Sequence, residues 1–160
     1  MRITQWGEYG IHFSLFLAKQ EKKGIASVGA SEIAESQGID TRYAQQILQR
    51  LRKGNIVKSV RGPQGGYKLT KSPAEITLLD ILIAAEGDSF EVICNSKPID
   101  NHRCAPKKSC GLRGIWHNLK DLVNNFLSDY TLEKLLNISE NDREFINDDM
   151  PIQIGRGLRL

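Results

Sequence analysis

Residues 30–70 decide the fold of this chain, and they read ASEIAESQGIDTRYAQQILQRLRKGNIVKSVRGPQGGYKLT. Two helical patterns come first, joined by a short turn that contains Gly38. In the second pattern, apolar residues recur at i, i+3, i+4 and i+7, so one face of that helix is apolar. These residues are Ala44, Ile47, Leu48 and Leu51. The opposite face is polar and basic, which leaves it available for a binding partner.

Two strand-like runs follow, at residues 56–60 and 66–70. They flank a turn rich in glycine and proline, so the order is helix, turn, helix, hairpin, which is the winged variant of helix-turn-helix. The expected fold class is therefore mainly α with a small β-wing. We expect Gly65 and Gly66 to supply positive φ values at the turn. Arg61 would then be held out on the hairpin, where an arginine suits a narrow minor groove.

Positive charge is concentrated in the same stretch. The whole chain carries a formal net charge of +3, yet residues 41–71 contain eight Lys or Arg residues and no Asp or Glu. These are Arg42, Arg50, Arg52, Lys53, Lys58, Arg61, Lys68 and Lys71. Binding to DNA phosphates requires such a local excess of positive charge. We therefore expect double-stranded DNA as the partner.

The helix over residues 41–53 carries the candidate base readers. The N-terminal turns of such a helix enter the major groove. Arg42, Gln45 and Gln46 are best placed there, since arginine pairs with guanine and glutamine with adenine. For Tyr43, a phosphate contact and a packing role are both open. Basic residues further along the helix are expected to contact the phosphate backbone: Arg50, Arg52 and Lys53.

Length and composition place limits on the class of protein. The 160 residues fit one domain with an extended arm. No apolar run is long enough for a membrane span, and no signal peptide is evident, so the expected location is the cytoplasm. No nucleophile–base pair and no phosphate-cradling loop points to an enzyme.

Three cysteines lie close together in an irregular stretch of sequence. Cys94, Cys104 and Cys110 have the spacing C-x9-C-x5-C. Three thiolates within one loop can converge on a metal. Free cysteines, a regulatory disulfide and a zinc site are the alternatives, although the spacing is not that of paired C-x2-C zinc ligands.

The longest helical pattern spans residues 112–129, and a broad apolar stripe runs along it. Such a stripe is more than one small domain can cover, so it predicts a two-helix seam in a homodimer. The expected organisation is a winged-helix domain at 1–87, a cysteine-bearing loop at 88–111, a dimerisation helix with a terminal helix at 112–137, and a mobile tail at 138–160.

The run RYAQQIL-x2-LRKGNIVKSVRGPQGGYKLT, followed by EITLLDI, resembles one family of regulators. These are the winged-helix repressors that include the iron–sulfur regulator IscR, the nitric-oxide sensor NsrR and the redox sensor RsrR. The resemblance extends from residue 1 to about residue 136. It implies a DNA-binding repressor whose operator affinity is controlled by an iron–sulfur cluster, with [2Fe–2S] favoured over [4Fe–4S]. The implied signal is redox state, nitric oxide or iron–sulfur status.

The resemblance also implies a set of cluster ligands. Arg113 stands where IscR-like proteins have a histidine ligand, and arginine has no lone pair to donate. Glu8 and His12 match the glutamate and histidine of RsrR-like proteins, although by themselves they would be an ordinary i,i+4 pair. By the same analogy, Cys94 and Cys110 are the main thiolate ligands, and Cys104 is the third candidate. His102 and His117 are fallback ligands.

Two other functions remain open on the sequence. One is a winged-helix regulator without a cluster, which responds to thiol oxidation or to a small metabolite. The other is a winged-helix module that binds proteins and never reads DNA.

Overall fold

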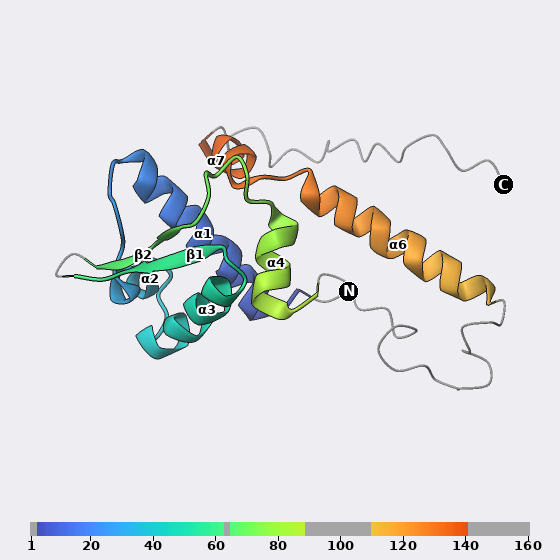
Figure 1. Cartoon of the computed structure of the whole chain (residues 1–160), viewed down its shortest axis with the longest axis horizontal. Coiled ribbons are helices and arrows are strands. Elements are labelled where there is room, and N and C mark those ends of the chain that lie inside the picture. The colour runs from blue at the N-terminus through green and yellow to red at the C-terminus, as the bar shows by residue number, and fades with distance from the viewer. Residues whose placement is uncertain (1–2, 63–64, 89–109, 141–160) are drawn as a thin grey trace.

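A computed structural model of the chain describes residues 3–62, 65–88 and 110–140. Cys94, Cys104 and His102 lie outside the described residues. The elements are α1 (Gln5–Lys22), α2 (Ala30–Ser36), α3 (Thr41–Lys53), β1 (Val57–Val60), β2 (Gly66–Leu69), α4 (Leu78–Glu86), α6 (Gly111–Ser128) and α7 (Leu132–Glu140). Figure 1 shows α1–α4, the hairpin and α7 as one body from which α6 projects. The predicted fold class, mainly helical with a two-stranded wing, is confirmed.

Helix α3 forms because its ends and its apolar face are both satisfied. The Asp40 side chain caps its first turn by accepting hydrogen bonds from the backbone N–H groups of Arg42 (2.9 Å) and Tyr43 (3.3 Å). Its four apolar residues, predicted from their spacing, are fully buried in the core. At the other end, Gly54 is the C-cap and Asn55 takes a φ of 59°, a left-handed conformation that asparagine tolerates.

The wing is an antiparallel pair in which Val57 lies opposite Leu69 and Val60 opposite Gly66. Val28 adds a bridge on the other edge of β2, exchanging two backbone hydrogen bonds with Tyr67 (2.9 and 2.8 Å). This bridge fixes the wing to the segment between α1 and α2.

The prediction of positive φ values at Gly65 and Gly66 was wrong. Gly62 has that conformation instead, with a φ of 122°. Gly65 and Gly66 are required for another reason: a Cβ atom would collide with the Val60 carbonyl at Gly65 and with the Val28 carbonyl at Gly66. The two glycines therefore permit close backbone approach, a second use of a missing side chain.

The core lies between α1, α3, α4 and the wing, and α7 closes it. Phe13 of α1, Ile81 of α4 and both Leu132 and Leu136 of α7 are fully buried. Backbone hydrogen bonds from Leu78 to Tyr130 (2.8 Å) and from Leu132 to Ile76 (2.9 Å) join the start of α4 to the start of α7. The terminal helix thus packs within the winged-helix body, and it extends to Glu140 rather than ending near residue 137.

Helix α6 spans one residue earlier than predicted at each end, and its apolar stripe is uncovered. Leu127 is the one buried residue of this helix. The exposed fractions of six large apolar side chains range from 36% to 68%: Leu112, Ile115, Trp116, Leu119, Leu122 and Phe126. A salt bridge between Lys120 and Asp88 (2.7 Å) ties the helix to the segment after α4. None of the helices in the described ranges is long and apolar enough to cross a membrane.

Candidate nucleic-acid interface

The outer face of α3 forms a polar ridge. The exposed side chains of α3 include Arg42, Gln45, Gln46, Gln49, Arg52 and Lys53, and the exposed Arg50 lies at the edge nearest α1 and α4. A groove of about 410 Å³ runs between this ridge and the wing, where Tyr67 of β2 forms the far wall. Arg42, Gln45, Gln46 and Arg52, all predicted to contact DNA, line this groove. The structure therefore brings these four predicted DNA-binding residues onto one surface.

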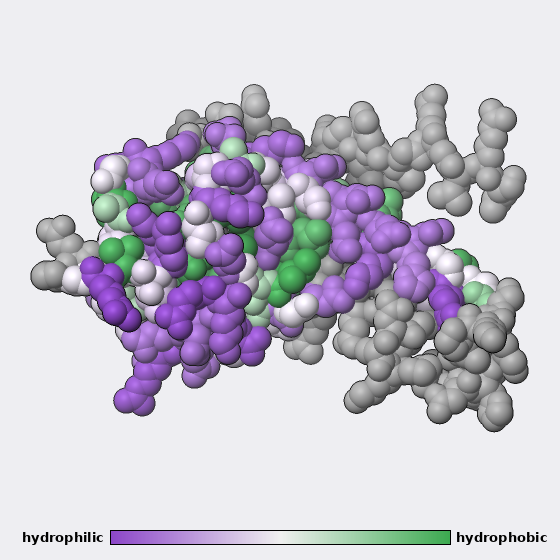
Figure 2. Space-filling view, viewed as in Figure 1, coloured by the Kyte–Doolittle hydropathy of each residue, from purple (hydrophilic) through white to green (hydrophobic). Residues whose placement is uncertain are grey.

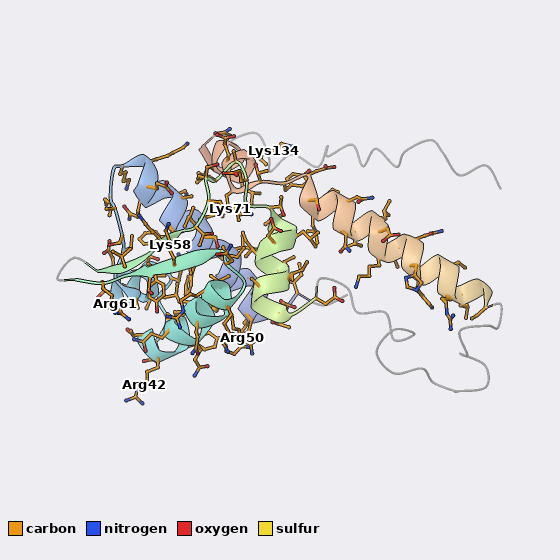
Figure 3. The ribbon with its side chains drawn as sticks, viewed as in Figure 1. Arg42, Arg50, Lys58, Arg61, Lys71 and Lys134 are labelled. Atoms are coloured by element: carbon orange, nitrogen blue, oxygen red, sulfur yellow. The ribbon has the colours of Figure 1, made fainter. Side chains whose placement is uncertain are left out.

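The basic residues of the stretch 41–71 do not all lie on that surface. Figure 3 shows Arg42 pointing away from the body at the N-terminal end of α3, and Arg61 on the hairpin on the same side of the molecule. Lys71, in contrast, lies beside α7, on the other side of the body. Figure 2 shows a largely hydrophilic surface over the region that α3 occupies in Figure 1. The positively charged surface is thus built from α3 and the wing, and Lys71 is not part of it.

Tyr43 packs against α1. Its ring makes edge contacts with Trp6 (centroids 5.3 Å apart) and Tyr9 (5.8 Å), both on α1. The side chain is half-buried. Of the two roles left open for Tyr43, the structure therefore provides evidence for packing.

Arg50 also turns toward the body. Its Nη1 atom donates a hydrogen bond to the Ala85 carbonyl of α4 at 2.9 Å. Its guanidinium carbon lies 4.2 Å from the centre of the Trp6 ring. A second groove, of about 480 Å³, lies on this side of α3 and is lined by Trp6, Gln46, Gln49, Arg50, Lys53, Ala84, Glu86 and Gly87.

Gln49 and Tyr67 also line these grooves, although neither was predicted as a site residue. Gln49 lines both grooves, and Tyr67 faces α3 across the first. Helical spacing would have found Gln49, because it is four residues after Gln45 and so shares its face. Tyr67 depends on how the wing folds back against α3, and no local signal contains that information.

The predicted cluster ligands are placed in two separate parts of the described chain. Glu8 and His12 are exposed on the surface of α1, which is one of the helices of the body. Cys110 is half-buried at the N-cap of α6, at the end of the arm that projects away from α1 (Figure 1). His117 is half-buried on α6. Within residues 3–62, 65–88 and 110–140, no three His, Cys, Asp or Glu side chains are grouped so that they could hold a metal ion.

Similarity to known proteins agrees with this architecture. The Rrf2 family of iron-dependent transcriptional regulators matches residues 3–138. The HTH-type transcriptional regulator IscR of Photorhabdus laumondii is 34% identical over 140 residues, covering 88% of this chain and 82% of that protein.

Two solved structures have the same fold. CymR, the global cysteine regulator of B. subtilis, is 30% identical with a TM-score of 0.67, over 86% of this chain and 97% of CymR. IscR of T. potens is 29% identical with a TM-score of 0.68, over 89% and 91%. The family match covers α3, the wing and α6 together. The chain belongs to the Rrf2 family, and it is a DNA-binding transcriptional regulator rather than an enzyme.

Proposed function

We propose that this chain is a homodimeric repressor in the cytoplasm whose affinity for its operator is controlled by an iron–sulfur cluster, [2Fe–2S] in preference to [4Fe–4S]. The observation that carries the proposal is the division of donor groups: Glu8 and His12 are exposed on the body, and Cys110 stands at the start of an uncovered arm. A second copy of the chain would bring the two sets together.

DNA recognition follows from the polar ridge on α3. An α-helix fits the major groove of B-DNA, and side chains on its outer face then reach the base edges. Arg42, Gln45 and Gln46 are the proposed base readers, and Gln49 extends the same face by one turn. Arg52 and the hairpin residue Arg61 would contact phosphate and the minor groove.

Dimerisation is supported by the uncovered stripe of α6. Large exposed apolar surfaces of this kind mark interfaces between proteins. Two copies of α6 packed together would cover the stripe and place two reading helices on one side of the dimer. Such a dimer reads two half-sites about one DNA turn apart.

The donor set has suitable chemistry for a cluster. Cysteine thiolates bind iron, and a histidine nitrogen can replace a thiolate and raise the reduction potential. Cys110 would supply one thiolate, with Cys94 and Cys104 as further candidates outside the described residues, and Glu8 and His12 of the second copy would complete the site. When bound, the group would supply a centre that changes with redox state or can be lost. Glu8 and His12 would then link that change to α1, which contacts Tyr43 of the reading helix through Trp6 and Tyr9.

The test is an anaerobic preparation with iron and sulfide counts, ultraviolet–visible and electron-paramagnetic-resonance spectra, and operator binding before and after cluster removal. We expect Cys94→Ala and Cys110→Ala to lose stable cluster incorporation while the dimer remains folded. Cys104→Ala distinguishes two possible ligand sets: a normal cluster in this variant would indicate a site with two cysteines, and loss of the cluster would indicate a site with three. A full complement of iron and sulfide in Cys110→Ala would rule that residue out as an essential ligand.

The helix α1 ligands require their own variants. His12→Ala should alter or abolish the cluster spectrum, and Glu8→Ala should change it less, since water can replace a carboxylate. DNA binding by the cluster-free protein should be unchanged in both. An unchanged spectrum and DNA response in the Glu8→Ala/His12→Ala double variant would exclude α1 and return attention to His102 and His117.

The second candidate function is a cluster-free regulator that responds to thiol oxidation or a metabolite. The similarity to CymR over most of the chain favours it. A colourless protein after anaerobic purification, with operator affinity that changes on thiol oxidation, would support this candidate against the first.

A further inference from the structure

Helices α1, α3 and α4 meet at the C-terminal end of α4. Gly54, which ends α3, lies so close to Ala84 of α4 that a Cβ atom would collide with it. A Cβ atom at Gly7 of α1 would collide with the Glu86 carboxylate and with the Leu82 side chain, both on α4. The backbone N–H of Thr4 donates to the Glu86 carboxylate at 2.8 Å, which joins the start of α1 to the end of α4. Helices α1 and α3 are therefore both packed closely against α4 at this junction.

The Arg50 side chain of α3 contacts both other helices there. Ala85 is one of the last four residues of α4, whose carbonyl groups have no partner within an ideal helix. Such a helix end carries a partial negative charge, and a hydrogen-bonding cation stabilises it. The hydrogen bond from Arg50 to Ala85 (2.9 Å) satisfies one of these carbonyls with a positive group.

The same guanidinium is packed on α1. It lies 4.2 Å from the centre of the Trp6 ring, within the range of a cation–π interaction. Trp6 also contacts Tyr43, which lies two helical turns before Arg50 on α3. One ring of α1 thus contacts α3 at two points along its length, and this fixes the rotation of α3 as well as its position.

We propose that Arg50 is a positioning residue for operator recognition: it holds the reading helix in register with α1 and α4, and it does not serve as a phosphate contact. This differs from the role expected from its place in the basic stretch. The inference rests on the proposed function, since it assumes that α3 reads an operator. The requirement is for arginine specifically, because a planar guanidinium can stack on an indole and donate to a carbonyl at once, whereas an ammonium group is a compact point charge.

Lys53 provides a matched control. It is exposed, lies one turn further along α3 and lines the same groove. If Lys53 contacts phosphate, Lys53→Gln should weaken binding to all duplexes alike and reduce the salt slope by about 1. Arg50→Lys keeps the positive charge, so it would preserve a phosphate contact but not the stacked, hydrogen-bonded arrangement.

The experiment begins with selection of an operator from a random duplex library by the wild-type protein. Affinities for that operator and for a scrambled duplex are then measured from low to high salt for Arg50→Lys, Arg50→Gln, Trp6→Leu, Trp6→Phe and Lys53→Gln. We expect Arg50→Lys and Trp6→Leu each to lower operator affinity roughly tenfold, with little change for the scrambled duplex. Trp6→Phe, which keeps an aromatic face, should recover part of the loss. In the double variant Trp6→Leu/Arg50→Gln, the loss of operator affinity should be smaller than the sum of the losses in the two single variants, because both substitutions break the same contact between Arg50 and Trp6.

Three results would overturn the proposal. One is wild-type operator affinity in Arg50→Lys together with a uniform loss and a reduced salt slope in Arg50→Gln, which would identify a phosphate contact. Another is additive losses in the double variant, since Trp6 and Arg50 would then act separately. The third is a parallel loss on operator and scrambled duplex in Arg50→Lys and Trp6→Leu, which would indicate a role in general stability. A wild-type protein that selects no operator would instead refute the proposed function.

Discussion

Helices α3 and α6 are both amphipathic, yet their apolar faces meet opposite fates in the structure. The apolar face of α3 is fully buried, against α1, α2, α4 and the wing. The apolar face of α6 is exposed along nearly its whole length. The comparison teaches that periodicity identifies a face which must be covered, and that only the surrounding structure tells whether the chain covers it itself. For α3 the partner is internal, and for α6 we expect a second copy.

The largest effect should come from charging the stripe of α6. Ile115→Asp/Leu122→Asp should give a monomer, because charged groups are costly to bury in an apolar seam. Loss of bivalent binding should lower affinity for a palindromic operator roughly 100- to 10,000-fold. Sedimentation equilibrium and operator titration measure the two effects. Asn125→Asp, on the polar flank of the same helix, is the control, and a persistent dimer in the double variant would show that α6 is not the seam.

The next largest effect should be on stability: truncation of an apolar side chain should destabilise the fold in α3 but not in α6. Leu48→Ala on α3 should lower the free energy of unfolding by about 2–5 kcal/mol, because it removes a fully buried side chain and leaves a cavity. Leu119→Ala, placed in the monomeric Ile115→Asp/Leu122→Asp background, should change it by less than about 0.5 kcal/mol. Urea unfolding measures both. Equal losses would mean that α6 is packed within its own chain.

Substitutions on the polar face of α3 and on the wing should have smaller effects on operator affinity, and these effects should depend on the DNA sequence. Gln46→Ala should relax preference at one base position at a cost of about 1–3 kcal/mol per lost bidentate contact. Arg61→Ala should lower affinity chiefly at operators with an A·T-rich flank. Competition binding with single-base operator variants measures the difference. Uniform losses across all sequences for both variants would contradict this division of roles between the helix and the wing.

A small effect on stability, without an effect on base preference, should come from substitution of the N-cap residue of α3. Asp40→Ala removes the acceptor for two backbone N–H groups and should cost about 1 kcal/mol of stability. Asp40→Asn, which retains an acceptor, should cost less. Thermal or urea unfolding of the cluster-free protein gives the comparison. The N-cap residue of α6, Cys110, makes no side-chain hydrogen bond to the first turn of its helix, so its replacement should not remove a helix cap.

Close approach of backbones explains why the role predicted for two glycines of the wing was wrong. Gly65 and Gly66 were correctly selected as necessary, but for a positive φ that neither residue adopts. Their actual contacts are with carbonyl groups of Val60 and Val28, and the second of these is remote in sequence. A glycine that avoids a collision has the same local signature as a glycine that turns the chain, so sequence alone does not separate the two.

The sequence by itself determined the winged-helix fold and the outer face of α3. Both depend on local rules: apolar spacing along a helix, turn residues between strands, and a polar face left over once the apolar one is assigned. The bounds of α3 and the residues of its buried face agree with the prediction for this reason. The family pattern was also readable in the sequence, since the motifs of the helix and wing are contiguous.

Tertiary structure alone decided how the charged and aromatic residues are used. Arg50 and Arg52 are two residues apart in one basic stretch, yet Arg50 contacts Trp6 and Ala85 while Arg52 faces the groove beside the wing. Lys71 belongs to the same stretch and lies on another side of the molecule. Residues two apart on a helix point in nearly opposite directions, and the partners of Arg50 are supplied by helices whose contacting residues lie 35 or more positions away in the chain. Charge can therefore be counted from a sequence, but its direction is set only when the helices pack.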